Sequence, residues 1–125
     1  MKTEDFIRAY NESRNGANQF FLHPLVRRFA YSDGVQECAN AGAHWALDIF
    51  ATELPTVMLA HDEFMGCVTI KVKHTKATMV MTGSGDVQRW MRKIDYTDMP
   101  DGEWLFFVTN NDGDGVFRCI LPSEY

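Results

Sequence analysis

Apolar and polar residues follow two different periods along this chain, and the change falls between residues 56 and 66. Before it, apolar positions recur every three or four residues, as they do on one face of an α-helix. After it they alternate, so that Val68, Ile70 and Val72 are separated by Thr69 and Lys71. The pattern predicts an α+β fold in which N-terminal helices pack on an antiparallel β-meander of about five strands.

The helical half divides into four segments with recognisable ends. Thr3 is a suitable N-cap for the first helix, and Ser32 or Asp33 is suitable for the third. Gly42 interrupts or ends the third helix. Pro55 ends the fourth, because the residue before a proline is driven out of the helical region. The predicted helices cover residues 4–14, 25–29, 33–40 and 43–53.

The second half predicts five strands, over residues 68–73, 77–82, 87–94, 104–109 and 116–121. In a meander, alternate turns lie at the same end of the sheet, so the turns at 83–86 and 110–115 would share one end. That end would gather the carboxylates of Asp86, Asp112 and Asp114. The turns at 74–76 and 98–103 would share the other end.

The hydrophobic core is expected where the most apolar helix, residues 43–53, crosses the buried face of the sheet. The last strands should contribute the aromatic side chains of that core. The residues predicted to form it are Trp45, Ile49, Phe50, Val68, Ile70, Val72, Phe106, Val108 and Phe117.

The chain length of 125 residues fits one domain. Within it we expect an N-terminal helical segment over 1–22, a helical part over 23–56 and the meander over 66–121. Neither an internal repeat nor an interdomain linker interrupts the sequence.

Charge and cysteine content narrow the function classes. A net charge of -5 disfavours a general nucleic-acid or membrane-surface binder, because both need a dense positive face. Three widely spaced cysteines fit a reducing compartment and no disulfide framework. With an acidic start and no apolar run of about 20 residues, the sequence predicts a cytoplasmic protein without a membrane span.

Residues 110–115 resemble the opening of a calcium-binding loop. With Asn110 at the first position, Asp112 and Asp114 take the third and fifth, and Gly115 takes the sixth. The twelfth position, which should be a bidentate Glu, is Leu121. We therefore expect a β-turn there and neither a bound metal nor another cofactor.

His44 and Asp48 are four residues apart on a predicted helix, so they can face one another. A histidine oriented by a carboxylate can act as a general base, and His23 or His61 could join it in a small hydrolase or nuclease-like enzyme. The alternative is a structural pair or two unrelated surface groups, and no nucleophile is recognisable nearby in sequence.

Four segments together resemble the pattern of an uncharacterised family of small prokaryotic proteins, often met in phages and mobile elements. They are His23-Pro24-Leu25, residues 31–35 (YSDGV), residues 41–48 (AGAHWALD) and residues 121–125 (LPSEY). The resemblance covers about 23–125 and makes 1–22 a variable N-terminal helix particular to this chain. The family usually has an aromatic at the place of His44, which argues against a family-wide catalytic role for it.

The resemblance implies a genomic setting, from which we draw the leading hypothesis. The chain is expected to be a non-enzymatic protein that binds a host protein or complex, as an inhibitor of a host defence system such as an anti-CRISPR does. The rivals are the enzyme with His44 and Asp48 and a homo-oligomeric accessory protein. The candidate contact residues are Asp86, Asp112, Asp114, Trp90 and Tyr125.

The closing segment 121–125 is expected to fold back on the helical layer, because Pro122 cannot continue a strand ladder. Tyr125 would pack near residues 23–31, and the terminal carboxylate would lie near Arg27 or Arg28.

Overall fold

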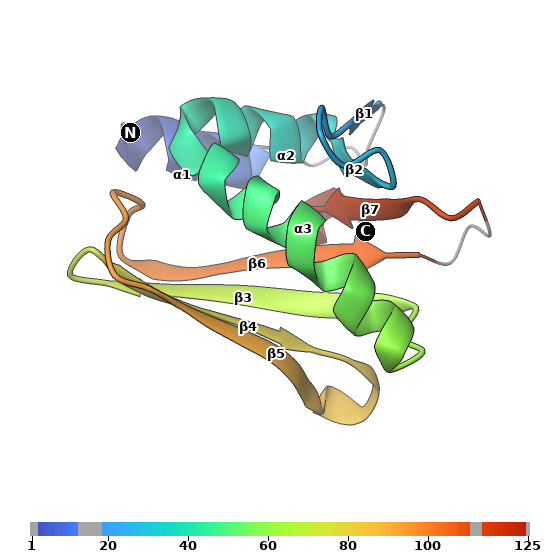
Figure 1. Cartoon of the computed structure of the whole chain (residues 1–125). Coiled ribbons are helices and arrows are strands. Elements are labelled where there is room, and N and C mark those ends of the chain that lie inside the picture. Colours follow the sequence, from blue (N-terminus) through green and yellow to red (C-terminus); the bar gives the residue numbers. More distant parts are fainter. Residues whose placement is uncertain (1–2, 13–18, 111–113, 125) are drawn as a thin grey trace.

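The computed structural model of the chain describes residues 3–12, 19–110 and 114–124. It is an α+β fold in which three helices lie on one side of a seven-stranded sheet (Figure 1). The helices are α1 (Thr3–Glu12), α2 (Asp33–Cys38) and α3 (His44–Ala60), with a π-helical turn, Ala39–Ala43, between the last two. The strands are β1 (Phe20–Leu22), β2 (Phe29–Ser32), β3 (Met65–Lys73), β4 (Lys76–Thr82), β5 (Gln88–Ile94), β6 (Gly102–Thr109) and β7 (Phe117–Ile120).

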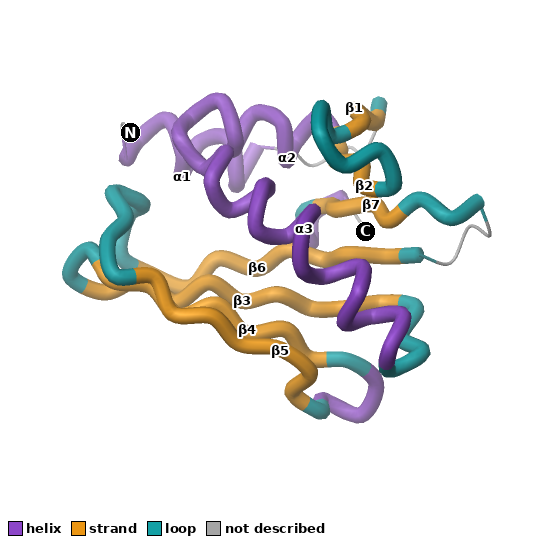
Figure 2. The backbone as a smooth tube through the Cα atoms, in the orientation of Figure 1, coloured by secondary structure: helices purple, strands orange, loops and turns teal. Residues whose placement is uncertain are grey.

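The strand order, β1-β2-β7-β6-β3-β4-β5, corrects the predicted five-strand meander. After β5 the chain returns across the sheet, and β6 pairs antiparallel with β3, placing Phe106 opposite Val68. Polarity explains the order, because β5 carries Arg89, Arg92 and Lys93 and suits a sheet edge. The sheet is mixed, since β2 runs parallel to β7. Figure 2 shows these two strands next to one another.

Residues 25–29 were predicted as a helix, and that prediction is wrong. They form a loop and the start of β2, which pairs antiparallel with β1 and parallel with β7. The His23 N–H donates to the Phe29 carbonyl at 2.8 Å and closes the loop. Short apolar runs do not distinguish a strand from a buried helical turn, and the distant β7 decides the outcome here.

The predicted start and interruption of the α2 region are confirmed, and the predicted end of α3 is wrong. Ser32 is the N-cap of α2 and accepts from the Val35 N–H at 3.2 Å. Gly42 has φ 121°, which a residue with a side chain rarely adopts. Helix α3 continues past Pro55 to Ala60. Pro55 is buried, so its packing offsets the one backbone hydrogen bond that a proline removes.

The core lies between α3 and the sheet face that it covers, which we call the inner face. Phe50 of α3 is fully buried and meets Phe106 edge-on, with ring centroids 5.8 Å apart. Seven of the nine predicted core residues are buried. Trp45 and Ile49 are only half-buried, at the border of the buried stripe of α3, so their prediction as core residues is corrected. The reason is that alanines occupy the centre of the helix contact.

Tyr10 of α1 completes an edge that the sheet leaves open. β7 pairs with β6 only over Phe107–Thr109, so Leu105 lacks a strand neighbour on that side. The Tyr10 hydroxyl donates to the Leu105 carbonyl at 3.1 Å and accepts from the Leu105 N–H at 2.9 Å. One side chain thereby satisfies both backbone groups and fixes α1 against the sheet.

Truncation of a core aromatic tests the assignment of the inner face. Phe50→Ala should lower the free energy of unfolding by about 3–5 kcal/mol, because it opens a cavity at a fully buried position. Leu59→Ala, on the exposed side of the same helix, should change it by less than about 0.5 kcal/mol. Urea denaturation measures both, and equal losses would contradict the orientation of α3.

Candidate functional site

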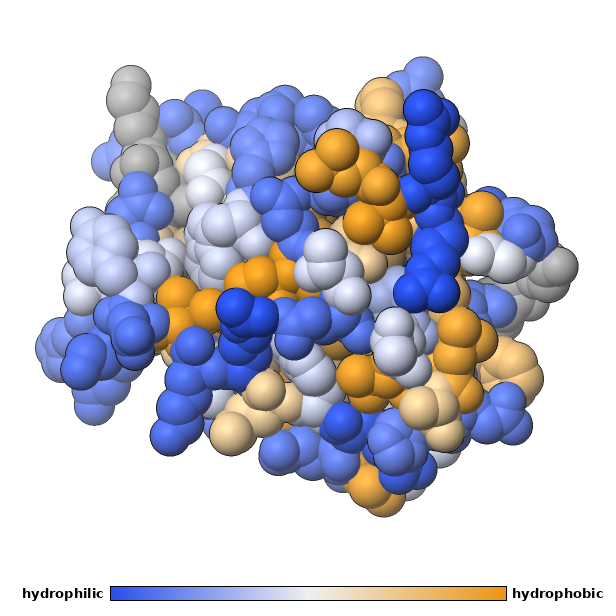
Figure 3. Space-filling view, in the orientation of Figure 1, coloured by the Kyte–Doolittle hydropathy of each residue, from blue (hydrophilic) through white to orange (hydrophobic). Residues whose placement is uncertain are grey.

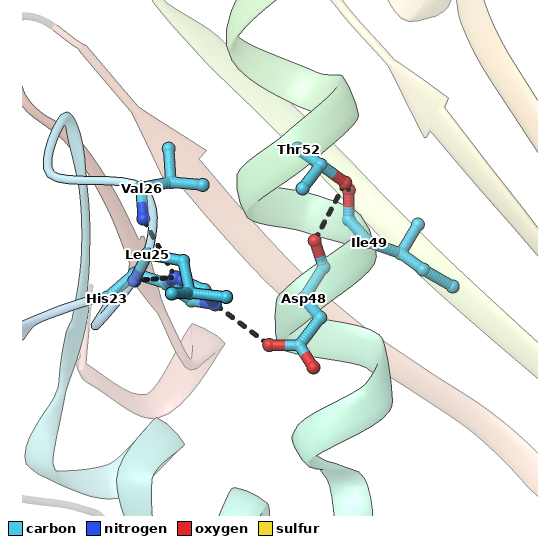
Figure 4. A network of polar contacts seen from close by, with 6 residues as sticks. All are labelled: His23, Leu25, Val26, Asp48, Ile49 and Thr52. Atoms are coloured by element: carbon cyan, nitrogen blue, oxygen red, sulfur yellow. Dashed lines mark hydrogen bonds and ion pairs between the residues drawn. The ribbon is translucent and has the colours of Figure 1, made fainter.

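A buried histidine ties the β1–β2 loop to α3 (Figure 4). His23 is 4% exposed, and its Nε2 lies 2.8 Å from Oδ1 of Asp48. Its Nδ1 accepts from the backbone N–H groups of Leu25 and Val26, each at 3.1 Å. Because Nδ1 accepts, the proton of the neutral ring is on Nε2, which donates to Asp48.

This arrangement pairs Asp48 with His23, where the sequence had suggested His44. His44 is exposed at the start of α3, and the Asp48 side chain is 66% exposed. Both nitrogens of His23 are occupied by contacts within the chain, so no lone pair on its ring points at a substrate site. The geometry is that of a structural tie between a loop and a helix.

The tie holds a loop that displays apolar side chains and cations. Leu25 is 87% exposed, and Leu22 and Phe21 of the adjoining β1 are 51% and 38% exposed. Arg27 and Arg28 follow and are exposed as well. Figure 3 shows hydrophobic and strongly hydrophilic side chains side by side over the β1–β2 connection. We call residues 21–28 the hairpin loop.

The closing segment is tied to the start of α2. Glu124, in the 3₁₀ turn Pro122–Glu124, accepts from the Ser32 hydroxyl at 2.6 Å and from the Leu121 N–H at 2.8 Å. Its other oxygen accepts from the Gly34 N–H at 3.3 Å. The expected return of this segment to the helical layer is thus confirmed through Glu124, whereas the predictions for Tyr125 lie outside the described residues.

The Gly83-Ser84-Gly85 turn is filled by a carboxylate of the same chain. Glu63, which is 3% exposed, accepts from the Ser84 N–H at 3.0 Å and from the Ser84 hydroxyl at 2.8 Å. Arg89 Nε donates to it at 3.1 Å. A Cβ at Gly83 would lie 1.5 Å from Glu63 Oε2, so glycine is required there. These contacts, first the Ser84 N–H, lower the pKa of Glu63.

The described members of the predicted acidic end lie in turns at the same end of the sheet, with β3 between them. Asp86 is exposed in the β4–β5 turn. Asp114 accepts from Arg118 Nη2 at 2.6 Å and from the Val116 N–H at 3.0 Å, and Arg118 lowers its pKa to about 2. Asp112 lies outside the described residues. At the other end, the His74 N–H donates to Asp101 at 3.2 Å, which confirms the predicted neighbours there.

Trp90 is used mainly within the fold. It lies on the inner face of β5 and is half-buried, and its ring N–H donates to Glu53 of α3 at 3.2 Å. Arg92 forms an ion pair with the same carboxylate. The hydrogen bond to Glu53 was not apparent from the sequence, and it is this contact that places Trp90 under α3.

No described helix covers the second face of the sheet, which we call the outer face. Burial alternates along β3 and β4, and the outward positions are half-exposed or exposed. Across its middle runs an apolar group, the outer band, formed by Cys67, Val80, Met91, Leu105, Phe107 and Ile120.

Lysines occupy one end of the outer face. Lys71, Lys73, Lys76 and Lys93 are four of the five lysines in the chain, and all four are exposed. The first three line a shallow hollow of ≈ 580 Å³ together with Asp101 and Glu103, and Glu103 lies 3.8 Å from Lys71 Nζ. Lys73 and Lys76 are direct cross-strand partners, a like-charge pair that costs stability. We call this group the lysine end.

Over residues 3–12, 19–110 and 114–124, no three His, Cys, Asp or Glu side chains are grouped to hold a metal ion. The described helices include none with the length and apolarity to cross a bilayer.

The chain belongs to DUF6876, a family of unknown function whose model matches residues 8–125. The expectation of an uncharacterised family is therefore confirmed. The match begins upstream of residue 23, which corrects the assignment of all of 1–22 as particular to this chain. No curated protein and no solved structure matches the sequence.

Substitutions of His23 and Asp48 should show how much each hydrogen bond of the tie contributes to the free energy of unfolding. His23→Ala removes the acceptor of two backbone N–H groups and should cost about 2–4 kcal/mol of unfolding free energy. Asp48→Ala leaves the Nε2–H to water and should cost about 1 kcal/mol, whereas Asp48→Asn keeps an acceptor oxygen and should cost less. Urea denaturation gives the order, and an Asn variant as unstable as the Ala variant would contradict the acceptor role.

The Glu63 contact should make stability depend on pH in a stated direction. Its pKa is lower in the folded than in the unfolded chain, so its contribution is complete above the unfolded pKa and disappears as pH falls through the folded value. The stability difference between wild type and Glu63→Gln should be constant near pH 7 and should shrink below about pH 4. The exposed Glu103→Gln is the control, and a difference that grows on acidification would contradict the argument.

Proposed function

We propose that this chain is a non-enzymatic protein-binding module of phage or mobile-element origin, which blocks a host defence or regulatory protein. The observation that carries the proposal is the hairpin loop, in which buried His23 accepts from two backbone N–H groups beside three exposed apolar side chains.

The loop has the properties of a preorganised contact. Because His23 binds the N–H groups of Leu25 and Val26, the loop loses little conformational entropy when a partner covers it. Arg28 is further steadied by Thr56 of α3, whose hydroxyl accepts from Nη2 at 3.3 Å. The backbone at Leu25 is thereby held in one conformation, and two cations follow it in the chain.

The chemistry of the loop defines its partner. Leu25 and its apolar neighbours require an apolar depression, and Arg27 and Arg28 require carboxylates on its rim. The partner is therefore a protein surface with an apolar pocket bordered by Asp or Glu. The net charge of -5 favours such a localised contact over binding to a nucleic acid.

The alternative function, a hydrolase or nuclease built on His44 and Asp48, has less support. Asp48 is engaged by His23 at 2.8 Å, and His23 has no nitrogen left for proton transfer. The host-inhibitor setting comes from the family resemblance over His23-Pro24-Leu25 and the later motifs. His23 and Asp48, which form the tie, both stand in those motifs. The family pattern therefore includes the residues that shape the loop.

A site-specific photo-crosslinker at position 25 tests the loop in host cells. We expect one host protein to be joined at position 25 and none at position 59, where Leu59 is similarly apolar and 59% exposed on α3. With the joined protein purified, Leu25→Asp should weaken binding by about 100-fold and Arg27→Glu by about tenfold, because each replaces a complementary contact by a carboxylate. Leu59→Asp should bind as the wild type does.

Phage survival on a defence-positive host tests the biological part separately. Expression of the wild type and of Leu59→Asp should raise plaque numbers, and Leu25→Asp should not. Unchanged survival with the wild type would refute the inhibitor role. Full inhibition by a folded Leu25→Asp variant would refute the assignment to the loop.

A further inference from the structure

We infer that the outer face of the sheet binds a second copy of this chain, with the strands of the two copies antiparallel. This surface lies on the opposite side of the sheet from α3, to which the hairpin loop is tied, so the inference does not depend on the proposed function. Three properties of the face point to this one occupant: its apolar band, its area and the arrangement of its charges.

The outer band is the apolar element. Met91 is 50% exposed, and Val80, Leu105 and Phe107 are half-exposed in neighbouring strands. The cross-strand pairs Val80–Met91 and Cys67–Phe107 place these side chains in adjoining rows. A contiguous apolar surface of this kind on a sheet marks an interaction site.

The area of the face meets what a stable pair requires. Five strands at a spacing of about 4.8 Å and seven residues at about 3.4 Å give a face of about 24 Å by 24 Å. Two such faces bury about 1,200 Å² when they pack together, which is the lower bound of a standard-size specific interface. Aligned sheet-on-sheet packing is a common arrangement for faces of this shape.

The charges select the second copy and its direction. The lysine end carries the opposed pair Lys73 and Lys76 next to Asp101 and the Lys71–Glu103 ion pair, and an excess of positive charge remains there. At the opposite end, exposed Asp86 lies in the β4–β5 turn beside Cys67 and Thr82 of the outer face. A two-fold axis perpendicular to the strands puts each lysine end over the Asp86 turn of the other copy, and an axis along the strands would put lysine over lysine.

Light scattering over a concentration series tests the dimer with the full chain. We expect twice the chain mass of 14.3 kDa at high concentration. Thr69→Lys, which places a charge between Leu105 and Val80, should raise the dimer Kd by at least about tenfold. Leu59→Lys is the matched control, since it adds the same charge at an exposed apolar site on α3. Circular dichroism should show that both variants keep the fold of the wild type.

Charge reversal decides the direction. The double variant Lys73→Glu with Lys76→Glu should raise the dimer Kd by about tenfold when the strands are antiparallel, and would lower it if lysine faced lysine. A monomer at all concentrations, or a dimer that Thr69→Lys leaves intact, would overturn the inference. A dimer strengthened by the charge reversal would overturn the antiparallel direction.

Discussion

The packing of α3 on the inner face of the sheet is the contact on which the rest of the molecule depends. Phe50 and Phe106 are buried at its centre, and β3, β4 and β6 supply the face beneath. Since α1, α2 and α3 all lie on this side, the core has two layers, and no helix of the described residues covers the other face of the sheet (Figure 1). A two-layer α+β core leaves one sheet face to be solvated or bound.

Three polar contacts lie around that core, in connections that make fewer apolar contacts than the helices and strands do. His23 joins the β1–β2 loop to Asp48, Glu124 joins the last turn to Ser32, and Glu63 fills the Ser84 turn. Each is a side chain that accepts backbone N–H groups, so each fixes a connection and not a regular element. Their role is to give loops one conformation.

The two proposed surfaces, the hairpin loop and the outer face, follow from these polar contacts and from the one-sided packing of the helices. The hairpin loop gains a fixed shape through its tie to α3, and the outer face gains its exposure from the one-sided layering. Because the sheet lies between α3 and the outer face, association through the outer face leaves both hairpin loops of a pair accessible. Such a pair presents two equivalent contacts, which increases the effective affinity for a partner that is itself repeated.

The sequence by itself determined the α+β class, the alternating strands, a helix cap at Ser32 or Asp33 and the interruption at Gly42, because these depend on local periodicity and on backbone preferences. It did not determine the strand order, since the choice of β6 as the neighbour of β3 depends on which distant strand can be central. The same limit made 25–29 a helix, whereas these residues form a loop and the first residue of β2, which β7 pairs. His23 and Asp48 stand in recognisable motifs, yet only the tertiary structure decided that they pair with each other, because hydrogen bonds between distant segments leave no local pattern.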